Sequence, residues 1–127
     1  MLIGAYDQVT DESIQRIQTH TMTVLVRLER NFDNHHTEEN RYELFKTDYE
    51  NLAGETESLM IRCKSIPKYS IIIEQVTLLE KNLSDLEKYH QNGIKSKAEL
   101  VPIKQAFESE FGGMIVLQNS LKRKKTD

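Results

Sequence analysis

Two adjacent histidines are the first residues whose chemistry suggests a site. His35 and His36 follow Asp33 and precede Glu38 and Glu39, so imidazole and carboxylate groups, which are common metal ligands, lie close together in the chain. On a helix, however, neighbouring side chains project about 100° apart, and zinc sites favour histidines four residues apart. We therefore expect a solvated polar patch and no metal site, and a small helical metal-binding protein remains an alternative.

The single cysteine, Cys63, offers nucleophilic chemistry. A reactive cysteine needs a lowered thiol pKa and a base within reach. Arg62 and Lys64 adjoin Cys63 in sequence, but they would project from other faces of a helix. The chain has no glycine-rich phosphate loop, nucleophile elbow or paired-histidine helix motif. We therefore expect no catalytic residue, no cofactor and no enzymatic activity.

A basic cluster, Lys122-Arg123-Lys124-Lys125, stands out from an acidic chain whose formal net charge is −3. Such a cluster offers a contact for an acidic partner or an anionic membrane surface. The plainer interpretation is a solvated basic tail over residues 122–127. Since there is no second basic stripe, we do not expect nucleic-acid binding.

The composition predicts helices to position these groups. A chain of 127 residues fits one domain, and its 5 glycines and 2 prolines are too few for the frequent turns of an all-β fold. One cysteine excludes an intramolecular disulfide framework, and no apolar run is long enough to span a membrane. The first residues lack the basic and apolar regions of a secretory signal. We expect an all-α protein with a cytoplasmic location.

The first predicted helix follows an irregular segment, residues 1–10. Its apolar residues recur at alternating steps of three and four, as in a coiled coil. They are Ile14, Ile17, Thr21, Val24 and Leu28. The same register continues across the polar residues 31–40 to Tyr42 and Phe45. A loop has no reason to preserve register, so the pattern favours a continuous or bent helix over a turn, although both remain open.

Two features divide the rest of the chain. Pro67 disfavours a helical conformation at the preceding residue, so it breaks a coiled-coil region that spans residues 11–92. A capping-box sequence that begins at Ser96 then starts a C-terminal helix within residues 93–121. Pro102 and the Gly112-Gly113 pair predict that this last helix is short or bent.

The strongest signal is a pair of apolar stripes that meet at Pro67. Isolated helices are marginal in water, so the stripes must pack on each other as a bundle or receive partner helices. Polar and aromatic residues on the stripes favour a heteromeric assembly of three or more helices over a uniform two-stranded zipper. We predict twelve partner-interface residues: Tyr42, Phe45, Tyr49, Leu52, Leu59, Ile66, Tyr69, Ile72, Val76, Leu79, Leu83 and Leu86.

Residues 67–91 also resemble a known family. The matching residues are Pro67, Tyr69, Glu74-Gln75-Val76, Leu79-Glu80, Leu86 and Tyr89. Their spacing is similar to that of the coiled-coil subunits of the biogenesis-of-lysosome-related-organelles complex, most of all subunit 2, which is shared with the BORC lysosome-positioning complex. The resemblance implies a non-enzymatic subunit of an elongated hetero-oligomer whose stripes contact other helical subunits.

Taken together, the sequence predicts long amphipathic helices that form a coiled coil or an elongated helical bundle. The expected function is that of a complex subunit in endosome or lysosome-related organelle biogenesis, sorting or positioning. Such a subunit would be cytoplasmic and peripheral on endosomal or lysosomal membranes. A kinetochore, spindle or other tethering-complex subunit is the alternative, because it would show the same periodicity.

Overall fold

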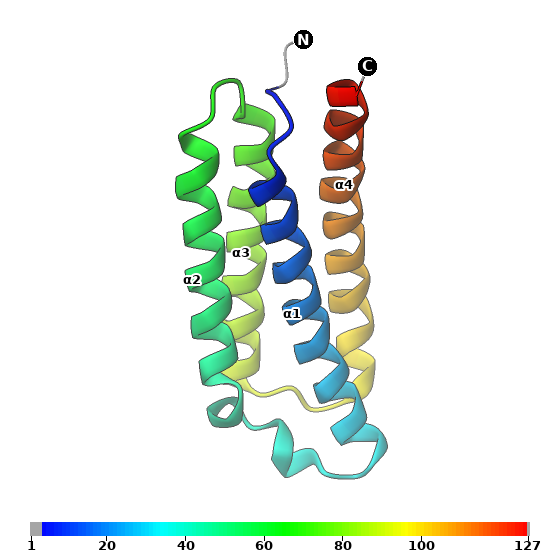
Figure 1. Ribbon diagram of the computed structural model, residues 1–127. Coiled ribbons are helices and arrows are strands. Elements are labelled where there is room, and N and C mark those ends of the chain that lie inside the picture. The colour runs from blue at the N-terminus through cyan, green and yellow to red at the C-terminus, as the bar shows by residue number, and fades with distance from the viewer. Residues whose placement is uncertain (1–3, 127) are drawn as a thin grey trace.

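Among the described residues, four long helices form an elongated bundle in which helices that follow each other in the chain run antiparallel (Figure 1). The computed structural model describes residues 4–126, and no strand occurs among them. The helices are α1 (Gln8–Asp33), α2 (Lys46–Lys64), α3 (Ser70–Asn92) and α4 (Leu100–Thr126), with short 3-10 turns η1 (Thr37–Asn40), η2 (Tyr42–Leu44) and η3 (Lys97–Glu99). The expected all-α fold and helical bundle are thereby confirmed.

The bundle has an up-down-up-down topology in which each helix packs against its neighbours in sequence, and α4 closes the ring against α1. Contacts are densest between α2 and α3 and between α1 and α2, whereas α3 and α4 contact each other less. Within the part of the chain that the structure describes, no helix combines the length and apolar character that crossing a bilayer requires.

Helix α1 begins earlier than the sequence suggested. Its N-cap is Asp7, whose carboxylate accepts hydrogen bonds from the backbone N–H of Thr10 at 3.0 Å and from its hydroxyl at 2.6 Å. The helix therefore starts at Gln8, and the expectation of an irregular segment through residue 10 is wrong. Arg62 donates two hydrogen bonds to the same carboxylate, at 2.8 and 2.9 Å, and so ties the start of α1 to the end of α2.

The expectation of a continuous helix through residues 31–40 is also wrong. Helix α1 ends at Asp33, and the chain then reverses at His35, whose φ of 59° lies in the left-handed region. Asn40 fastens the turn, because its amide donates to the Leu28 carbonyl at 3.0 Å and accepts from Asn31 at 2.8 Å. The heptad spacing that continues across residues 31–40 indicates that the helices on both sides each have one apolar stripe. It does not indicate whether a helix or a turn connects them.

The second connection contains Pro67 and lies beneath the first described residues. Gly4 donates its N–H to the Lys68 carbonyl at 2.9 Å, and the Tyr69 hydroxyl donates to the Ala5 carbonyl at 2.7 Å. A Cβ at Gly4 would approach the Tyr69 ring to 2.4 Å, so the close approach of the two segments requires glycine there. At the other end of α3, Gly93 ends the helix with a φ of 101°.

Helix α4 is longer than predicted. The capping box of Ser96 and Glu99 is present, and Pro102 sits in the first turn, where its missing N–H removes no helical hydrogen bond. The Gly112-Gly113 pair does not interrupt the helix, which continues to Thr126. The basic segment predicted as a tail is therefore helical as far as Thr126, whereas Asp127 lies outside the described residues.

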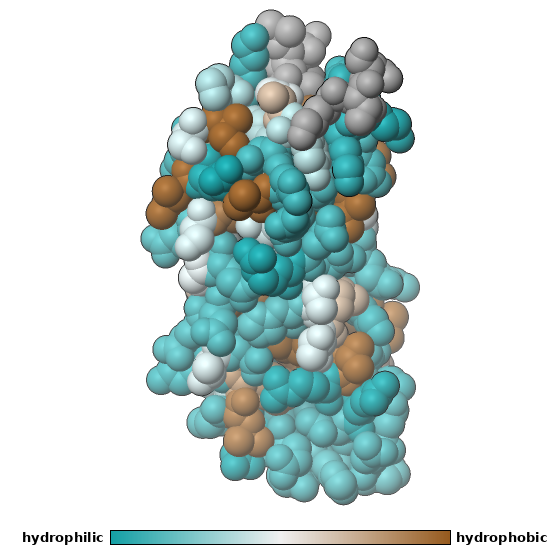
Figure 2. Space-filling view, in the orientation of Figure 1, coloured by the Kyte–Doolittle hydropathy of each residue, from teal (hydrophilic) through white to brown (hydrophobic). Residues whose placement is uncertain are grey.

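The core contains apolar side chains from all four helices, and the face drawn in Figure 2 is mostly hydrophilic, with hydrophobic side chains in separate places. Among the buried polar residues, one has a side-chain amide without a hydrogen-bond partner. Gln118 on α4 is 0% exposed, and neither its Nε2 nor its Oε1 has a hydrogen-bond partner among the described residues. A buried amide without partners weakens the bundle at this level.

Replacing Gln118 by leucine keeps a similar volume and removes the unpaired amide. Because a buried unsatisfied polar group costs about 1–3 kcal/mol, we expect Gln118→Leu to raise the free energy of unfolding by about that amount in urea titrations. The matched variant Gln105→Leu, at an exposed position of α4, should change it by less than about 0.5 kcal/mol. Destabilisation by Gln118→Leu would contradict this assignment.

Candidate functional site

The structure places the predicted partner-interface residues inside the chain's own core. Ten of the twelve are buried against neighbouring helices of the same chain. The other two, Tyr42 and Ile66, are partly buried and pack against the same core. The stripes therefore pack on each other as a bundle, which was one of the two arrangements open from the sequence. In this conformation they present no continuous surface to a partner.

His90, a polar residue on the α3 stripe, belongs to a buried hydrogen-bond network. Its Nδ1 lies 2.7 Å from the Tyr49 hydroxyl, and its Nε2 lies 2.5 Å from the Asn40 carbonyl oxygen. A neutral imidazole satisfies both contacts, because Nε2–H donates to the carbonyl while Nδ1 accepts from the hydroxyl. Burial lowers the pKa of His90 and so favours this neutral form. The network joins the η1 turn to α2 and α3.

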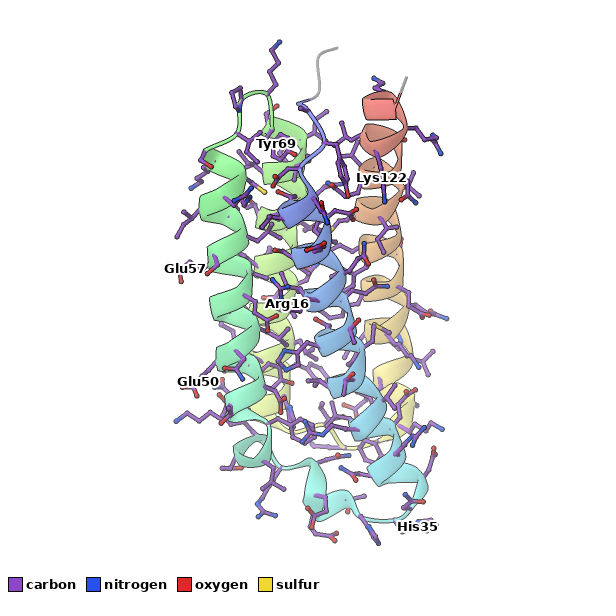
Figure 3. All side chains as sticks on the ribbon, in the orientation of Figure 1. Arg16, His35, Glu50, Glu57, Tyr69 and Lys122 are labelled. Atoms are coloured by element: carbon purple, nitrogen blue, oxygen red, sulfur yellow. The ribbon has the colours of Figure 1, made fainter. Side chains whose placement is uncertain are left out.

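The other groups considered for chemistry are separated in space. His35 and His36 are exposed at the end of α1, and no cluster of metal-ligating side chains forms within residues 4–126 (Figure 3). Cys63 is fully buried, and desolvation raises the pKa of its thiol, which disfavours the reactive thiolate. Lys122 lies at the opposite end of the bundle, with its Nζ 5.9 Å from the centre of the Tyr6 ring.

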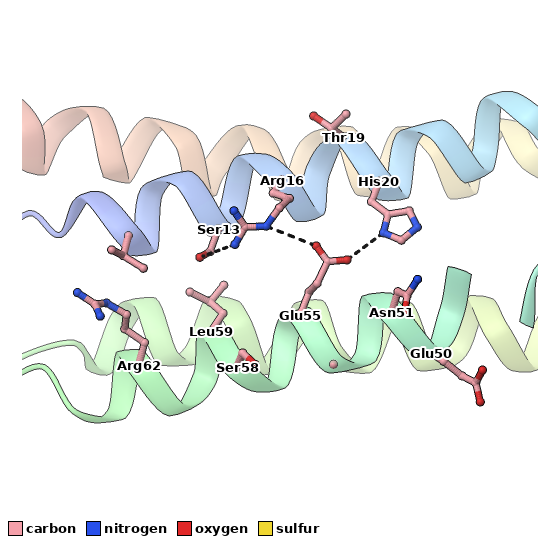
Figure 4. A pocket seen from close by; sticks show the side chains of 12 residues that line it. Ser13, Arg16, Thr19, His20, Glu50, Asn51, Glu55, Ser58, Leu59 and Arg62 are labelled. Carbon is pink, nitrogen blue, oxygen red and sulfur yellow. Dashed lines mark hydrogen bonds and ion pairs between the residues drawn. The ribbon is translucent and has the colours of Figure 1, made fainter. Parts of the chain in front are cut away.

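An open groove with a volume of about 1190 Å³ lies between α1 and α2 (Figure 4). It is lined by Val9, Ser13, Arg16, Thr19, His20, Glu50, Asn51, Gly54, Glu55, Ser58, Leu59 and Arg62. Small residues from both helices create the hollow, since a Cβ at Gly54 would meet no atom within 4 Å. The half-exposed Val9 supplies apolar surface to the groove, whereas Leu59 is 2% exposed and belongs to the core beneath it.

An ion network with His20 at its centre spans the groove. The Nδ1 of His20 lies 2.9 Å from Glu55 Oε1, and its Nε2 lies 3.1 Å from Asp48 Oδ1. Arg16 and Arg27 reach the same two carboxylates, at 3.8 Å from Glu55 and 2.8 Å from Asp48. Partial burial favours the neutral imidazole, but hydrogen bonds to the two carboxylates outweigh it and raise the pKa of His20.

Sequence analysis missed this network because its members are far apart in the chain. His20 is isolated in sequence, and Asp48 and Glu55 are two acids among many. Their seven-residue separation was the available signal, because it places both carboxylates on one face of α2. That face is turned toward α1, but no sequence feature showed which helix would meet it.

The groove offers small side chains, the exposed apolar side chain of Val9, and charged side chains of which Arg16 and Glu55 pair with each other. No nucleophile with an adjacent base lies among its lining residues. This combination suits binding of a polypeptide segment better than chemistry on a small molecule. Comparison with known proteins finds no matching family model, no matching curated protein and no matching solved structure.

The pKa values of His20 and His90 are shifted in opposite directions, so we expect the two residues to give opposite dependences of the unfolding free energy on pH. The folded pKa of His20 lies above its ordinary 6.5, so its bridge stabilises the fold fully below that value and is lost as pH rises through the folded pKa. The folded pKa of His90 is lowered, so its contribution is present above pH 6.5 and is lost as pH falls through the folded pKa.

Urea unfolding of the unmodified protein, His20→Gln and His90→Gln at several pH values tests these two opposite pH dependences of the unfolding free energy. The loss of unfolding free energy caused by His20→Gln should be larger near pH ~5.5 than near pH ~9. The loss caused by His90→Gln should be larger at the alkaline end. Equal losses at both ends of the range would show that the histidines do not titrate as assigned.

Proposed function

We propose that this protein is a non-enzymatic subunit of a hetero-oligomeric helical complex, and that it receives an amphipathic helix of another subunit in the groove between α1 and α2. The observation that carries this proposal is the groove itself. Small residues from two helices leave room there beside one exposed apolar side chain, that of Val9.

The dimensions and lining suit a helix. The groove follows α1 from Val9 to His20, which at about 1.5 Å per residue is roughly three helical turns. Ser13, Gly54 and Ser58 are short enough for another backbone to approach closely, as helix packing requires. We therefore expect a partner helix with small apolar residues on the face that contacts the groove.

The charges around the groove favour a defined partner. Arg16 pairs with Glu55 and Arg62 pairs with Asp7, whereas Glu50 is acidic and points away from the network drawn in Figure 4. A partner helix with charges of both signs in the complementary order matches this pattern, and one with the opposite order meets like charges. Charged groups thus supply selectivity, and the apolar contacts supply affinity.

The proposed cellular setting is an endosomal or lysosomal complex in organelle biogenesis, sorting or positioning. It rests on the resemblance of residues 67–91, which form the end of the α2–α3 loop and most of α3. Val76, Leu79 and Leu86, which belong to the matching residues of that segment, lie in the core of the bundle. The groove is on the α1–α2 side, so α3 would support the fold while other helices meet the partner.

A bulky residue in the groove tests the docking surface. Ser58→Trp places a large side chain among the small lining residues, so we expect at least about tenfold weaker binding of the partner helix with unchanged helicity. The matched variant Ile61→Trp changes an exposed α2 residue outside the lining and should bind as the unmodified protein does. Isothermal titration with the partner helix measures both.

The partner must first be identified, by purification from the native source followed by identification of the bound chains. Helical subunits of an endolysosomal complex, retained by Ile61→Trp and lost by Ser58→Trp, are the expected result. Equal retention by both variants would reject the groove as the docking site. Localisation of the tagged protein to spindle or chromatin foci, without endolysosomal puncta, would reject the proposed setting.

A further inference from the structure

Four exposed lysines from two distant segments of the chain lie at one end of the bundle. Lys64 and Lys68 belong to the end of α2 and the α2–α3 connection, and Lys122 and Lys124 belong to the last turns of α4. Figure 1 shows that this connection and the end of α4 lie at the same end of the molecule. We call these four residues the lysine surface.

Residues 4–6 connect the two parts of the lysine surface. Gly4 donates its N–H to the Lys68 carbonyl at 2.9 Å, and the Nζ of Lys122 lies 5.9 Å from the centre of the Tyr6 ring. Since two residues of extended chain span at most about 7 Å, Lys68 and Lys122 adjoin the same small region of this end. Figure 3 likewise shows Tyr69, the residue after Lys68, at the same end as Lys122.

The fold leaves the charges of these lysines available. Within residues 4–126, no carboxylate pairs with any of the four ammonium groups, and the contact of Lys122 with an aromatic ring keeps its charge. The two carboxylates in the first turn of α1 have other partners, because Arg62 donates to Asp7 and the Tyr6 hydroxyl donates to Asp11 at 2.6 Å. This end of the bundle therefore has an excess of positive charge.

Lys68 occupies a backbone position that does not favour lysine. Its φ of 66° lies in the left-handed region, where glycine and asparagine are the residues that fit with least strain. The Lys68 side chain is exposed and makes no contact that would stabilise the turn. Folding alone gives no reason for a lysine here, whereas a binding role of its charge does.

The opposite end of the bundle differs in charge. The η1 and η2 turns carry exposed Glu38, Glu39 and Glu43 beside the basic residues Arg41 and Lys46, so both signs are mixed there. The formal net charge of the whole chain is −3. An anionic surface therefore attracts the bundle by the lysine surface and repels much of the remainder.

We propose that the folded bundle docks end-on to an anionic membrane through the lysine surface. Lysine is a compact, hydrated point charge that suits the diffuse field of many headgroups, whereas arginine suits paired hydrogen bonds to one phosphate or carboxylate. The two arginines at this end are used within the fold, since Arg62 binds Asp7 and Arg123 donates to Ser120 at 3.3 Å. Headgroups contact all four lysines whatever their spacing, whereas an acidic polypeptide has to match it.

Sedimentation of the full chain with phosphatidylcholine vesicles, with and without phosphatidylserine, tests the docking. We expect binding only when phosphatidylserine is present, and we expect added salt to weaken it. Absence of binding at low salt would overturn the proposal. Tighter binding to soluble poly-L-glutamate than to vesicles of the same anionic charge concentration would also overturn it, in favour of an acidic polypeptide.

Two double variants with the same change in net charge separate a local surface from overall charge. Lys64→Gln with Lys122→Gln removes one lysine from each part of the lysine surface. It should weaken vesicle binding about 25-fold, since each basic residue near such a surface contributes about fivefold. The control, Lys46→Gln with Lys95→Gln, removes two exposed lysines at the opposite end and should change binding less than about twofold. Equal losses would show a response to net charge and would reject the lysine surface.

Lys68→Asn separates binding from folding at one residue. Asparagine fits the left-handed backbone at least as well as lysine, so urea titrations should show an unfolding free energy that is unchanged or higher. Vesicle binding should nevertheless weaken about fivefold, because one charge of the lysine surface is lost. Vesicle binding equal to that of the unmodified protein would show that Lys68 does not face the membrane.

Single tryptophans report which end meets the membrane, because the chain has no tryptophan of its own. Ser65→Trp places the reporter between Lys64 and Lys68, and the control Leu44→Trp places it in the η2 turn at the opposite end, at a residue that is 40% exposed. Brominated lipids should quench the fluorescence of Ser65→Trp and leave that of Leu44→Trp unchanged. Equal quenching of both would overturn end-on docking.

Discussion

The whole structure depends on the mutual burial of apolar stripes from four helices that are individually marginal in water. No single helix of 19 to 27 residues buries its stripe alone, so each is stable only when its neighbours cover it. The up-down topology satisfies this requirement with short connections. Those connections are themselves anchored in the core, as the buried Asn40 and His90 show. Packing and turn geometry therefore stabilise the same cooperative unit.

Because the core is complete, surface features carry the remaining functional information. The α1–α2 groove exists where small residues fail to fill the space between two helices, and its charged groups pair across that space through His20. The lysine surface consists of exposed side chains, none of which the core requires. None of its lysines lines the groove, so the roles of the two regions are separable by substitution.

The apolar periodicity was sufficient to predict the helices and most of the core. Phe45, Leu52, Leu79 and Leu86 are buried as an apolar stripe requires. Periodicity did not reveal what covers each stripe, since the chain's own helices and a partner's helices bury it equally well. It also misled at residues 31–40, where the turn depends on hydrogen bonds of Asn40 that heptad spacing does not encode. The His20 network was unpredictable because its partners lie on another helix.

The packing of α4 against α1 has a consequence for how the chain assembles during synthesis. The first helix and the last are neighbours in the ring, so the contact that closes the bundle joins the segments farthest apart in sequence (Figure 1). When the ribosome has released α1 to α3, the apolar sides that α4 will cover still face water. Apolar surface that is exposed in this way during synthesis is prone to aggregation until α4 covers it.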